Sequence, residues 1–548
     1  PAERSAHVSL AFGPASGRDD VGARRPAVTL AISKKKGTNA VTVAEQVVAR
    51  ARALEEEVLP DSVEMLVTRD YGRTADAKVD ERLGHLVLAI ITVIGLIAWS
   101  LGWREGLIVA AAVPITFALT LLLNMLAGYT INRVTLFALV LVLGMVCDDP
   151  IVDVENIHSN FKKRKLPPLL AVLFAVNEVR PPVIFATMAV ILSFLPMLFI
   201  SGMMGPYMRP MALNVPVTMF MSMVVAFTIT PWMAYHVLRR KYGAGGTESY
   251  EHTDPDDLDA LKQSRLYKVF YPLMAPLLHS RWVAWSFLIG MVVLTIGAMG
   301  LAALRSVPLK MLPFDNKNEL LLVLDFDEGT TLERADAAVR DFEAYLAGVP
   351  EVADYTSYVG LASPMDFNGL VRHYYLRQGD NVAELRINLA GKKNRRQQSH
   401  AIGLRMRSDL QTIAGRHRAR MKLVESPPGP PVIASLVAEV YGQPDDRYRD
   451  LLLAADTVRA RVAVEPGVED VDDVREAAQR KMTFVSDKEK AALNGITTEQ
   501  IADTLKALLA GDTVGLMRSD TERNPLRIEL RVPQDRRTSA ADLSKVQV

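Results

Sequence analysis

Three aspartates lie inside a segment that is otherwise apolar enough to cross a membrane. The run VTLFALVLVLGMVCDDPIVDVENIHSNF contains Asp148, Asp149 and Asp153. An acid in the middle of a membrane helix costs about 2.5–3.5 kcal/mol on insertion scales, and such residues usually mark a path for protons or ions. Two adjacent carboxylates in a medium of low dielectric constant cannot both stay charged cheaply. The pattern therefore favours a group that takes up and releases a proton.

Helical spacing separates the three acids. Asp149 and Asp153 are four residues apart and share a face, whereas Asp148 is rotated by about 100° from Asp149. An alternative is that the acids sit at the helix end and face cytoplasmic water, most of all Asp153. Pro150 has no N–H, so the carbonyl oxygen of Val146 is left free to bond elsewhere.

Six apolar runs of about 20 residues predict the membrane spans that must position these acids. The runs cover residues 85–103, 106–127, 134–157, 181–201, 212–238 and 283–304. Buried core helices of a large soluble protein are the alternative, but such helices rarely run this long without a polar face. Basic residues concentrate in the connections 103–105, 158–180 and 239–282, which the positive-inside rule places in the cytoplasm. The two long polar parts, 1–84 and 305–548, are then expected on the outer side.

Composition narrows the function classes. The chain has 548 residues, with 63 Lys and Arg against 62 Asp and Glu, and this even balance argues against a nucleic-acid binder. A single cysteine excludes a disulfide scaffold and a Cys-based structural zinc site. The sequence has no phosphate-binding Gly-rich loop with a following Lys, no HExxH and no GxSxG. We therefore predict no catalytic residues, no metal site and no cofactor. The chain starts with Pro1, and we expect it to be a piece of a longer protein.

The polar parts contain three strand–helix–strand patterns, within 27–72, from 319 into a strand that begins at 352, and within 434–487. Repeated β-α-β units predict α+β sandwiches of ferredoxin-like type. Between the fifth and sixth spans, SRLYKVFYPLMAPLLHS has an apolar helical stripe with basic neighbours, which predicts a helix along the membrane surface. A partly ordered linker is the alternative there.

The acidic segment also resembles a known family. GYTINRVTLFALVLVLGMVCDDPIVDVENI is similar to the fourth transmembrane helix of the resistance–nodulation–division (RND) superfamily, in its hydrophobe/amphiphile (multidrug) efflux type. That motif is a paired Asp followed by an apolar run and V-E-N. GWREGLIVAAAVPITFALTLL resembles the second and third helices of this family, and VVAFTITPWMAYHVL resembles the sixth. SVPLKMLPFDNKNELLLVLDFDEG is similar to the start of the second periplasmic domain, and RKMTFVSDKEKAALNGITTEQIADTLKALLAG to the region near the docking domain.

The resemblance covers most of the chain as a central fragment lacking both ends, and it implies a domain plan. Residues 1–84 would end the first periplasmic porter domain, and 85–240 would hold five spans of a polytopic helical membrane domain. Residues 241–282 would be a cytoplasmic linker with the surface helix, 283–304 the sixth span, and 305–548 the second periplasmic porter domain with part of the docking domain.

The implied function is a secondary transporter of the bacterial inner membrane, a homotrimer in which inward proton movement drives export of drugs or other amphiphiles. Its partners would be a periplasmic adaptor protein, an outer-membrane channel and the lipid bilayer. Asp148 and Asp149 would be the proton-translocating pair, with Asp153 as an accessory acid. Pro150 and Asp153 depart from the commonest family pattern, in which small and apolar residues occupy these places, and this leaves the proton stoichiometry and the coupling ion open.

A loop in the second polar part matches in position the loop that lines the substrate path of these pumps. It is YTSYVGLASPMDFNGLVRHYYLR, and its candidate substrate-path residues are Met365, Phe367, Leu370, Tyr374 and Tyr375. Such side chains can form an adaptable apolar surface. Ordinary strand and loop packing is the alternative.

Two other functions compete with drug efflux. A metal-ion pump of the same superfamily is suggested by a Met-rich stretch, because thioethers suit Cu(I). Its members are Met197, Met203, Met204, Met208, Met211, Met219, Met221 and Met223. An intramembrane aspartyl protease is the other alternative, but it needs acids that converge from two helices, whereas here all the membrane acids lie on one helix.

Overall fold

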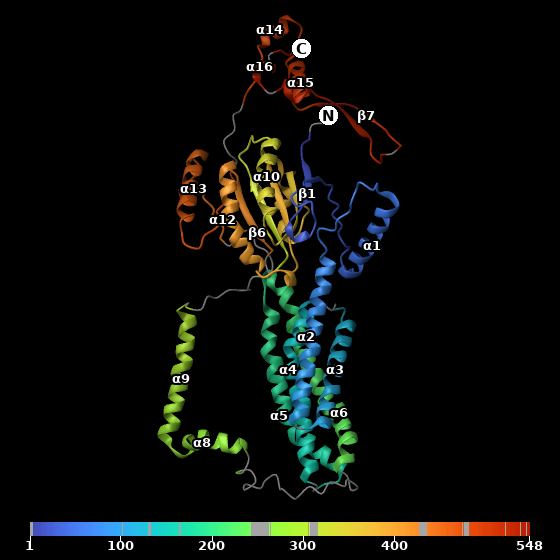
Figure 1. Ribbon diagram of the computed structural model, residues 1–548. Coiled ribbons are helices and arrows are strands. Elements are labelled where there is room, and N and C mark those ends of the chain that lie inside the picture. Colours follow the sequence, from blue (N-terminus) through green and yellow to red (C-terminus); the bar gives the residue numbers. More distant parts are fainter. Residues whose placement is uncertain are drawn as a thin grey trace. The chain divides into compact units, whose positions relative to one another are not determined.

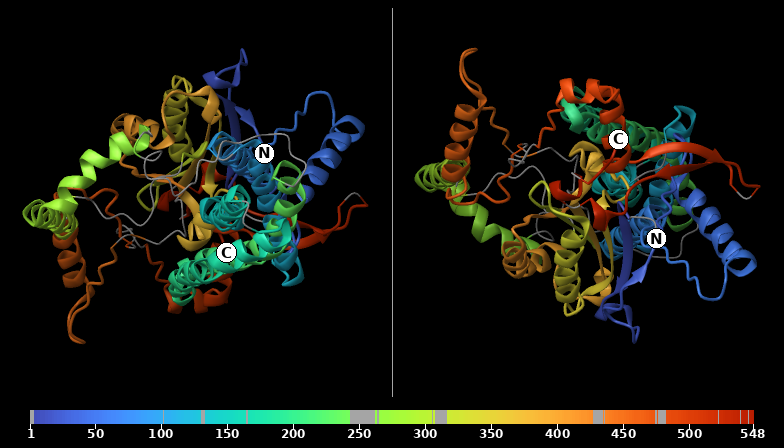
Figure 2. Two further views of the ribbon diagram at one scale, coloured as in Figure 1. Left: turned by 90° about the horizontal axis from the view of Figure 1, so that it is seen from below. Right: turned by 90° about the horizontal axis from the view of Figure 1, so that it is seen from above.

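The computed structural model describes residues 4–100, 102–129, 133–163, 166–242, 262, 265–304, 306, 316–426, 434, 436–473, 475, 482–520, 522–537, 539–543 and 545–548. The chain divides into two compact units. The sheet unit comprises Pro1–Ala31, Asp315–Ser426 and Pro431–Val548, and the helical unit comprises Ile32–Phe314 and Pro427–Pro430. Figure 1 labels their elements, and Figure 2 shows the same elements from the two ends.

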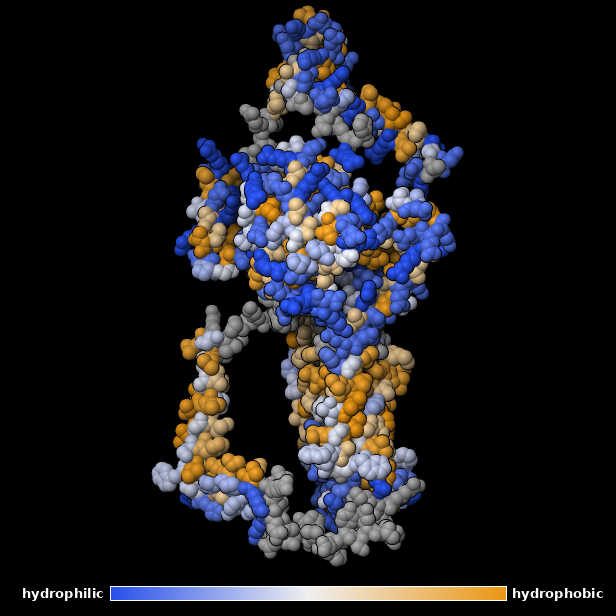
Figure 3. All heavy atoms as spheres, in the orientation of Figure 1, coloured by the Kyte–Doolittle hydropathy of each residue, from blue (hydrophilic) through white to orange (hydrophobic). Residues whose placement is uncertain are grey.

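Six helices of the described chain are long and apolar enough to cross a membrane, as the sequence predicts. They are α2 (Tyr71–Ser100), α3 (Trp103–Leu126), α4 (Arg133–Lys163), α5 (Pro168–Phe194), α6 (Gly205–Tyr242) and α9 (Arg281–Ala303). Hydrophobic side chains cover the surfaces of these helices, whereas the surface of the sheet unit is mainly hydrophilic (Figure 3). The helical unit therefore has the composition of a membrane domain.

The fourth span begins earlier than predicted, at Pro168 instead of residue 181. Pro181 and Pro182 lie inside α5, because neighbouring helices in a bundle can compensate for the backbone bonds that prolines remove. The span continues into the 3₁₀ helix η2 (Leu195–Phe199), and η3 (Gly202–Met204) leads into α6.

Helix α4 lies in contact with α2, α3, α5 and α6. Its buried apolar side chains, such as Leu139, Val146 and Ile157, form one core with residues of α3, α5 and α6. The central helix of the bundle is thus the one that carries the three aspartates.

Two further helices belong to the helical unit. Helix α1 (Ala40–Val58) starts at Asn39, whose side chain accepts a hydrogen bond from the backbone N–H of Val41 at 2.8 Å. Helix α8 (Arg265–His279) is present where the amphipathic helix is predicted, with Pro272 and Pro276 inside it. Its place on a membrane surface stays a prediction, and residues 243–261 of the predicted linker lie outside the described residues.

The sheet unit is built on a six-stranded antiparallel sheet. Its strands are β1 (His7–Phe12), β2 (Arg25–Pro26), β3 (Glu319–Asp325), β4 (Val352–Leu361), β5 (Gln378–Leu389) and β6 (Arg420–Glu425), in the order β2-β1-β4-β5-β3-β6. Helices α10 (Leu332–Leu346) and α12 (Ser399–His417) pack on one face, and buried residues such as Leu322, Phe342 and Leu410 form the core there. The predicted strand–helix–strand over β3, α10 and β4 is confirmed.

Of the strand predicted before α1, only Arg25–Pro26 forms, as β2, and the strands predicted after α1 and on either side of helix α13 (Tyr448–Val462) are wrong for the described residues. Residues 27–36, 61–70, 436–442 and 482–486 are extended or irregular without ladder pairing. A strand needs a neighbouring backbone as well as alternating side chains. Val28 and Leu30 illustrate the difference, because they alternate as a strand requires yet are 89% and 80% exposed. Helices α1 and α13 themselves, in contrast, lie where the helical periodicity of the sequence predicts them.

The remaining described elements are short. They are η1 (Pro14–Ser16), α11 (Phe367–Val371), η4 (Tyr374–Leu376), η5 (Lys392–Asn394), α14 (Lys488–Leu493), α15 (Thr498–Leu509), the hairpin of β7 (Asp512–Met517) and β8 (Leu526–Leu530), η6 (Gln534–Arg536) and α16 (Ala540–Leu543).

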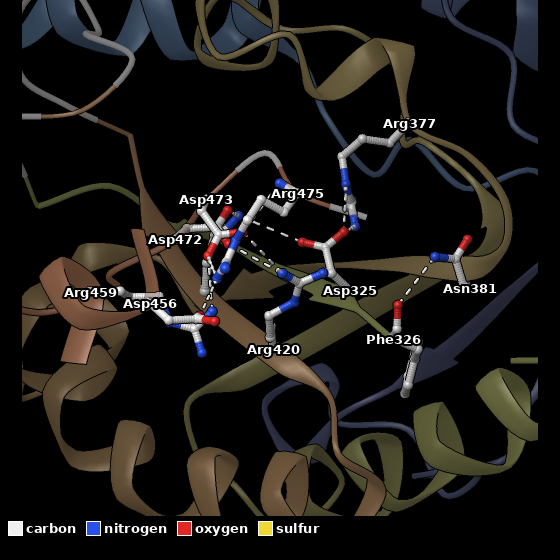
Figure 4. Close-up of polar contacts among 11 residues, drawn as sticks. Asp325, Phe326, Arg377, Asn381, Arg420, Asp456, Arg459, Asp472, Asp473 and Arg475 are labelled. Carbon is white, nitrogen blue, oxygen red and sulfur yellow. Dashed lines mark hydrogen bonds and ion pairs between the residues drawn. The ribbon is translucent and has the colours of Figure 1, made fainter. Parts of the chain in front are cut away.

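Charged side chains hold α13 near the edge strand β6 (Figure 4). The helix has no buried residue of its own. Asp473 accepts hydrogen bonds from Arg459 of α13 at 2.9 Å and from Arg475 at 2.7 Å. Its neighbour Asp472 pairs with Lys422 of β6. This attachment is electrostatic, so it should weaken as salt concentration rises.

Candidate functional site

Helix α4 gives its three aspartates different surroundings. Asp149 is 6% exposed and Asp153 is fully buried, whereas Asp148 is exposed on the described chain. Residues four apart lie above one another on a helix, so Asp149 and Asp153 share the face that points into the bundle. The structure brings these two together and turns Asp148 away from them. The alternative in which Asp153 faces cytoplasmic water is wrong for this bundle, because the neighbouring helices bury its side chain.

Pro150 connects α4 to α6 through the backbone. Because proline donates no hydrogen bond, the carbonyl oxygen of Val146 lacks its usual partner within the helix. The hydroxyl of Ser222 on α6 donates to this oxygen at 3.0 Å. The sequence-based expectation that this carbonyl bonds elsewhere is confirmed.

Hydroxyl groups from two other helices surround Asp149. Thr187 of α5 donates to Asp149 Oδ1 at 3.4 Å, and Ser222 also interacts with this carboxyl group. Oδ2 of Asp149 is buried without a hydrogen-bond partner among the described residues. One oxygen therefore accepts a single long hydrogen bond from a neutral donor, and the other has no bond to offset its burial.

Asp153 has even fewer hydrogen-bond partners than Asp149. Both of its carboxyl oxygens are buried and have no hydrogen-bond partner in the described part of the chain. No lysine or arginine of the described residues forms an ion pair with Asp149 or Asp153. A buried carboxylate without a cation or donors is costly, whereas the neutral acid is much less so. The arrangement suits groups that change protonation state.

Several other buried polar groups of the bundle have hydrogen-bond partners. Asn124 of α3 donates to Asn214 of α6 at 2.5 Å, and Asn214 donates to the carbonyl of Pro210 at 2.6 Å. Thr116 and Thr120 donate to carbonyls one turn earlier in α3 at 3.0 and 2.9 Å. Burial in this bundle therefore does not by itself deprive a polar group of hydrogen-bond partners.

Sequence reasoning missed a buried pair of a histidine and a glutamate near the C-terminal end of α4. His158 Nδ1 lies 2.7 Å from Oε1 of Glu105, which belongs to the first turn of α3, and both side chains are at least nine-tenths buried. The available signal is periodicity, because His158 continues the buried stripe of Val154 and Phe161. Glu105 gives no comparable signal, since it stands at the edge of an apolar run.

The predicted substrate-path residues lie in the sheet unit, on the segment that joins β4 to β5. Met365, Phe367, Leu370 and Tyr375 expose 59%, 48%, 43% and 38% of their surface. Tyr374 differs from them, because it packs against Leu321, Val323 and Val424, which form a small cluster separate from the α10–α12 core. Four of the five predicted residues are therefore accessible, and the fifth is packed against the sheet.

Ion pairs fix this segment to the sheet. Asp366 caps α11 by accepting from the N–H of Gly369 at 2.6 Å, and it pairs with Arg386 of β5 at 3.1 Å. Glu384 of β5 accepts from the N–H and the hydroxyl of Ser363 at 2.9 and 2.6 Å. The exposed apolar side chains thus stand on a backbone that is anchored at several points.

Comparison with known proteins decides the family. A family model described as AcrB/AcrD/AcrF matches residues 18–548. The chain belongs to this family. Membership confirms the resemblance to the RND superfamily, a group of transporters and not of enzymes, and so removes the protease alternative.

Two relatives are both named multidrug resistance protein MdtC. The protein of Yersinia enterocolitica is 28% identical over 337 residues, which cover 61% of this chain and 32% of the relative. That of Yersinia pseudotuberculosis is 25% identical over 491 residues, which cover 87% of this chain and 44% of the relative. The chain thus spans less than half the length of the curated relatives it matches.

Proposed function

We propose that the chain is part of a proton-driven secondary transporter that exports drugs or other amphiphilic compounds across the bacterial inner membrane. The observation that carries this proposal is Asp149, a nearly buried acid in the central helix with one oxygen unpartnered among the described residues. Proton entry down a membrane potential supplies about 2.3 kcal/mol per charge for each 100 mV. The relatives are named multidrug resistance proteins, which supports drugs as the exported compounds.

The proposed cycle uses the two protonation states of Asp149. The neutral acid is compatible with the buried site and can itself donate a hydrogen bond. Loss of its proton leaves a carboxylate that needs donors; Thr187 of α5 donates to it, and Ser222 of α6 can donate only by leaving the Val146 carbonyl. A change of charge on α4 therefore changes the preferred arrangement of three packed helices. Asp148 is the second acid of the pair in this proposal, on the other side of α4.

The sheet unit is proposed to be the porter on the periplasmic side. The order β3-α10-β4-β5-α12-β6, with sheet order β4-β5-β3-β6, supports a ferredoxin-like subdomain. The exposed residues Met365, Phe367, Leu370 and Tyr375, with the packed Tyr374, are its proposed substrate-contacting segment. A homotrimer with a periplasmic adaptor and an outer-membrane channel completes the proposal, supported by family membership.

The test replaces Asp149 by asparagine in the complete transporter and measures efflux of a fluorescent amphiphile from cells. We expect at least a tenfold loss of efflux at unchanged expression, because the amide cannot carry a proton. Glu155→Gln is the matched control, since Glu155 is an exposed acid of the same helix and should tolerate the change. Undiminished efflux by the Asp149→Asn variant would remove the proton role.

A further inference from the structure

Asp153 and Thr230 form a second group of unpartnered polar atoms in the helical unit. Both residues are fully buried. The two carboxyl oxygens of Asp153 and the hydroxyl oxygen of Thr230 have no hydrogen-bond partner among the described residues. Threonine in a helix commonly donates to the carbonyl one turn earlier, as Thr228 does to Val224 at 2.5 Å. Thr230 makes no such bond, so its hydroxyl is available to another group.

The two residues lie at the same depth on neighbouring helices. Helices α4 and α6 run in the same direction because α5 returns between them, and the bond from Ser222 to Val146 fixes their register. Asp153 is seven residues past Val146, and Thr230 is eight residues past Ser222. These separations correspond to rises of about 10.5 and 12 Å. A side chain at either position therefore lies level with the other.

Charged groups of the packed helices do not neutralise Asp153. On α4 itself, Asp149 acts on Asp153 from one turn away, with the same sign of charge. On α3, Glu105 is paired with His158. On α5, Glu178 accepts from the side chain of Asn156, and Arg180 is exposed. Helix α6 contributes Ser222 and Thr230, which are neutral.

We propose that Asp153 is a second proton-binding residue, one helical turn beyond Asp149 on the same face of α4, with the unpartnered Thr230 hydroxyl at a similar depth on α6. This inference rests on the proposed function and deepens it. A proton that leaves the Asp149 carboxyl binds an oxygen of Asp153, so that Asp149 becomes the carboxylate and Asp153 the neutral acid. Repulsion between two carboxylates this close disfavours the state in which both are ionised. One proton can therefore pass through two binding sites in series, first Asp149 and then Asp153.

Infrared spectroscopy of the purified complete transporter tests the site without relying on transport. A protonated buried carboxylic acid has its own carbonyl band, which disappears when the acid ionises. Among the bands seen in a pH titration, we expect one that Asp153→Asn removes and another that Asp149→Asn removes. Thr230→Val should shift the Asp153 band, whereas Thr228→Val and Glu155→Gln, at exposed positions on the same two helices, should leave both bands in place.

Transport in proteoliposomes gives the second readout. If the proton passes through Asp153, the rate of proton-driven transport depends on this acid. We expect Asp153→Asn to slow substrate transport at least tenfold at a fixed proton gradient, whereas Glu155→Gln should leave the rate unchanged.

The two proposals fail in different ways. An Asp153→Asn variant with both bands and an unchanged transport rate would overturn the second site, even if Asp149→Asn abolishes transport. Normal transport in Asp149→Asn would instead overturn the proposed function, while the Asp153 band could still be measured. Loss of the Asp153 band on addition of Na⁺ at constant pH would overturn the proton assignment in favour of a metal cation.

Discussion

Buried acids in the sheet unit and buried acids in the helical unit have different surroundings. In the sheet unit, Glu384 is 1% exposed, and Arg377 donates to it at 2.8 Å. In the helical unit, Asp149 has one weak donor at 3.4 Å, and Asp153 has none among the described residues. A paired buried charge is held in one state, because its loss leaves the partner uncompensated. An unpaired buried acid can change state at small cost, which is what proton transport needs.

The comparison predicts opposite effects of removing charge in the two units. Arg377 donates to Asp325 at 2.5 Å and to the carbonyl of Leu324 at 2.7 Å, besides its bond to Glu384. Arg377→Met should therefore lower the local free energy of unfolding by about 3–5 kcal/mol, because the buried Glu384 loses its cation and Asp325 keeps only Lys422 at 3.6 Å. Asp149→Asn should leave the stability of the bundle unchanged or raise it, since a neutral amide needs no cation. Hydrogen exchange of the β5 and α4 amides in the complete protein measures both effects.

Arg461 provides the control for that experiment. It is 78% exposed in its side chain and pairs at 3.4 Å with Glu465, which follows the end of α13. Exposed pairs of this kind contribute about 0.3–0.5 kcal/mol. If Arg377→Met costs no more than Arg461→Met, the distinction between paired and unpaired burial does not hold.

A second prediction concerns the acid that joins β1 to α10. Burial alone raises the pKa of Asp336, but Arg24 at 2.5 Å and His7 at 2.9 Å outweigh it and lower the pKa to about 2. The folded-state pKa is below the unfolded value, so the stabilisation is complete above the unfolded pKa and is lost as pH falls toward 2. Asp336→Asn should lower the stability of the β1–β4 ladder by about 2 kcal/mol at pH 7.

The measurement is hydrogen exchange of the β1 amides at a series of pH values, corrected for intrinsic exchange. The difference between the natural protein and Asp336→Asn should shrink steadily as pH falls from about 4 to about 2. A difference that persists unchanged at pH 2 would show that the ion pairs are not its source.

Asp354 should show the reverse pH dependence within the same sheet. Burial raises its pKa to about 6, and the hydrogen bond from Asn388 at 2.7 Å only partly offsets this. The unfolded chain ionises first, so stability falls as pH rises from about 4 to about 6. Asp354→Asn should therefore stabilise the sheet at pH 7, on the order of 1–2 kcal/mol, and have no effect below pH 4.

Hydrogen exchange of the β4 amides checks this prediction, with Asp336→Asn as a reference of opposite sign. Destabilisation by Asp354→Asn at pH 7 would mean that the carboxylate is favoured in the folded protein, contrary to its burial.

Sequence reasoning predicts what depends on local pattern and misses what depends on neighbours. The apolar runs predict all six candidate spans, and the missing N–H of Pro150 predicts a free carbonyl at Val146. The four-residue spacing puts Asp149 and Asp153 on one face, but which face of α4 meets other helices is decided by tertiary packing. The pattern therefore could not predict that Asp153 is buried and Asp148 exposed.

The same limit explains the wrong strands and the missed pair. Alternation at Val28 and Leu30 satisfies the side-chain requirement of a strand but supplies no partner backbone. Glu105 and His158 are 53 positions apart in the printed sequence, and only the packing of α3 on α4 brings them within 2.7 Å. The functional arrangement thus depends most on contacts between helices, where a single sequence is least informative.

The smallest predicted effect is the contact that links α4 to α6 beside the acidic site. In the natural protein, Ser222 donates to the Val146 carbonyl, which Pro150 leaves without a helical partner. Pro150→Ala restores an N–H that can bond this carbonyl, so Ser222→Ala should then cost less than it does alone. Interhelical hydrogen bonds in membranes contribute about 0.6 kcal/mol on average, and we expect a coupling of that size in a double-mutant cycle of thermal unfolding. Additive effects of the two substitutions would mean that the serine is held by its contact with Asp149 instead, and the free carbonyl would then play no part in joining the helices.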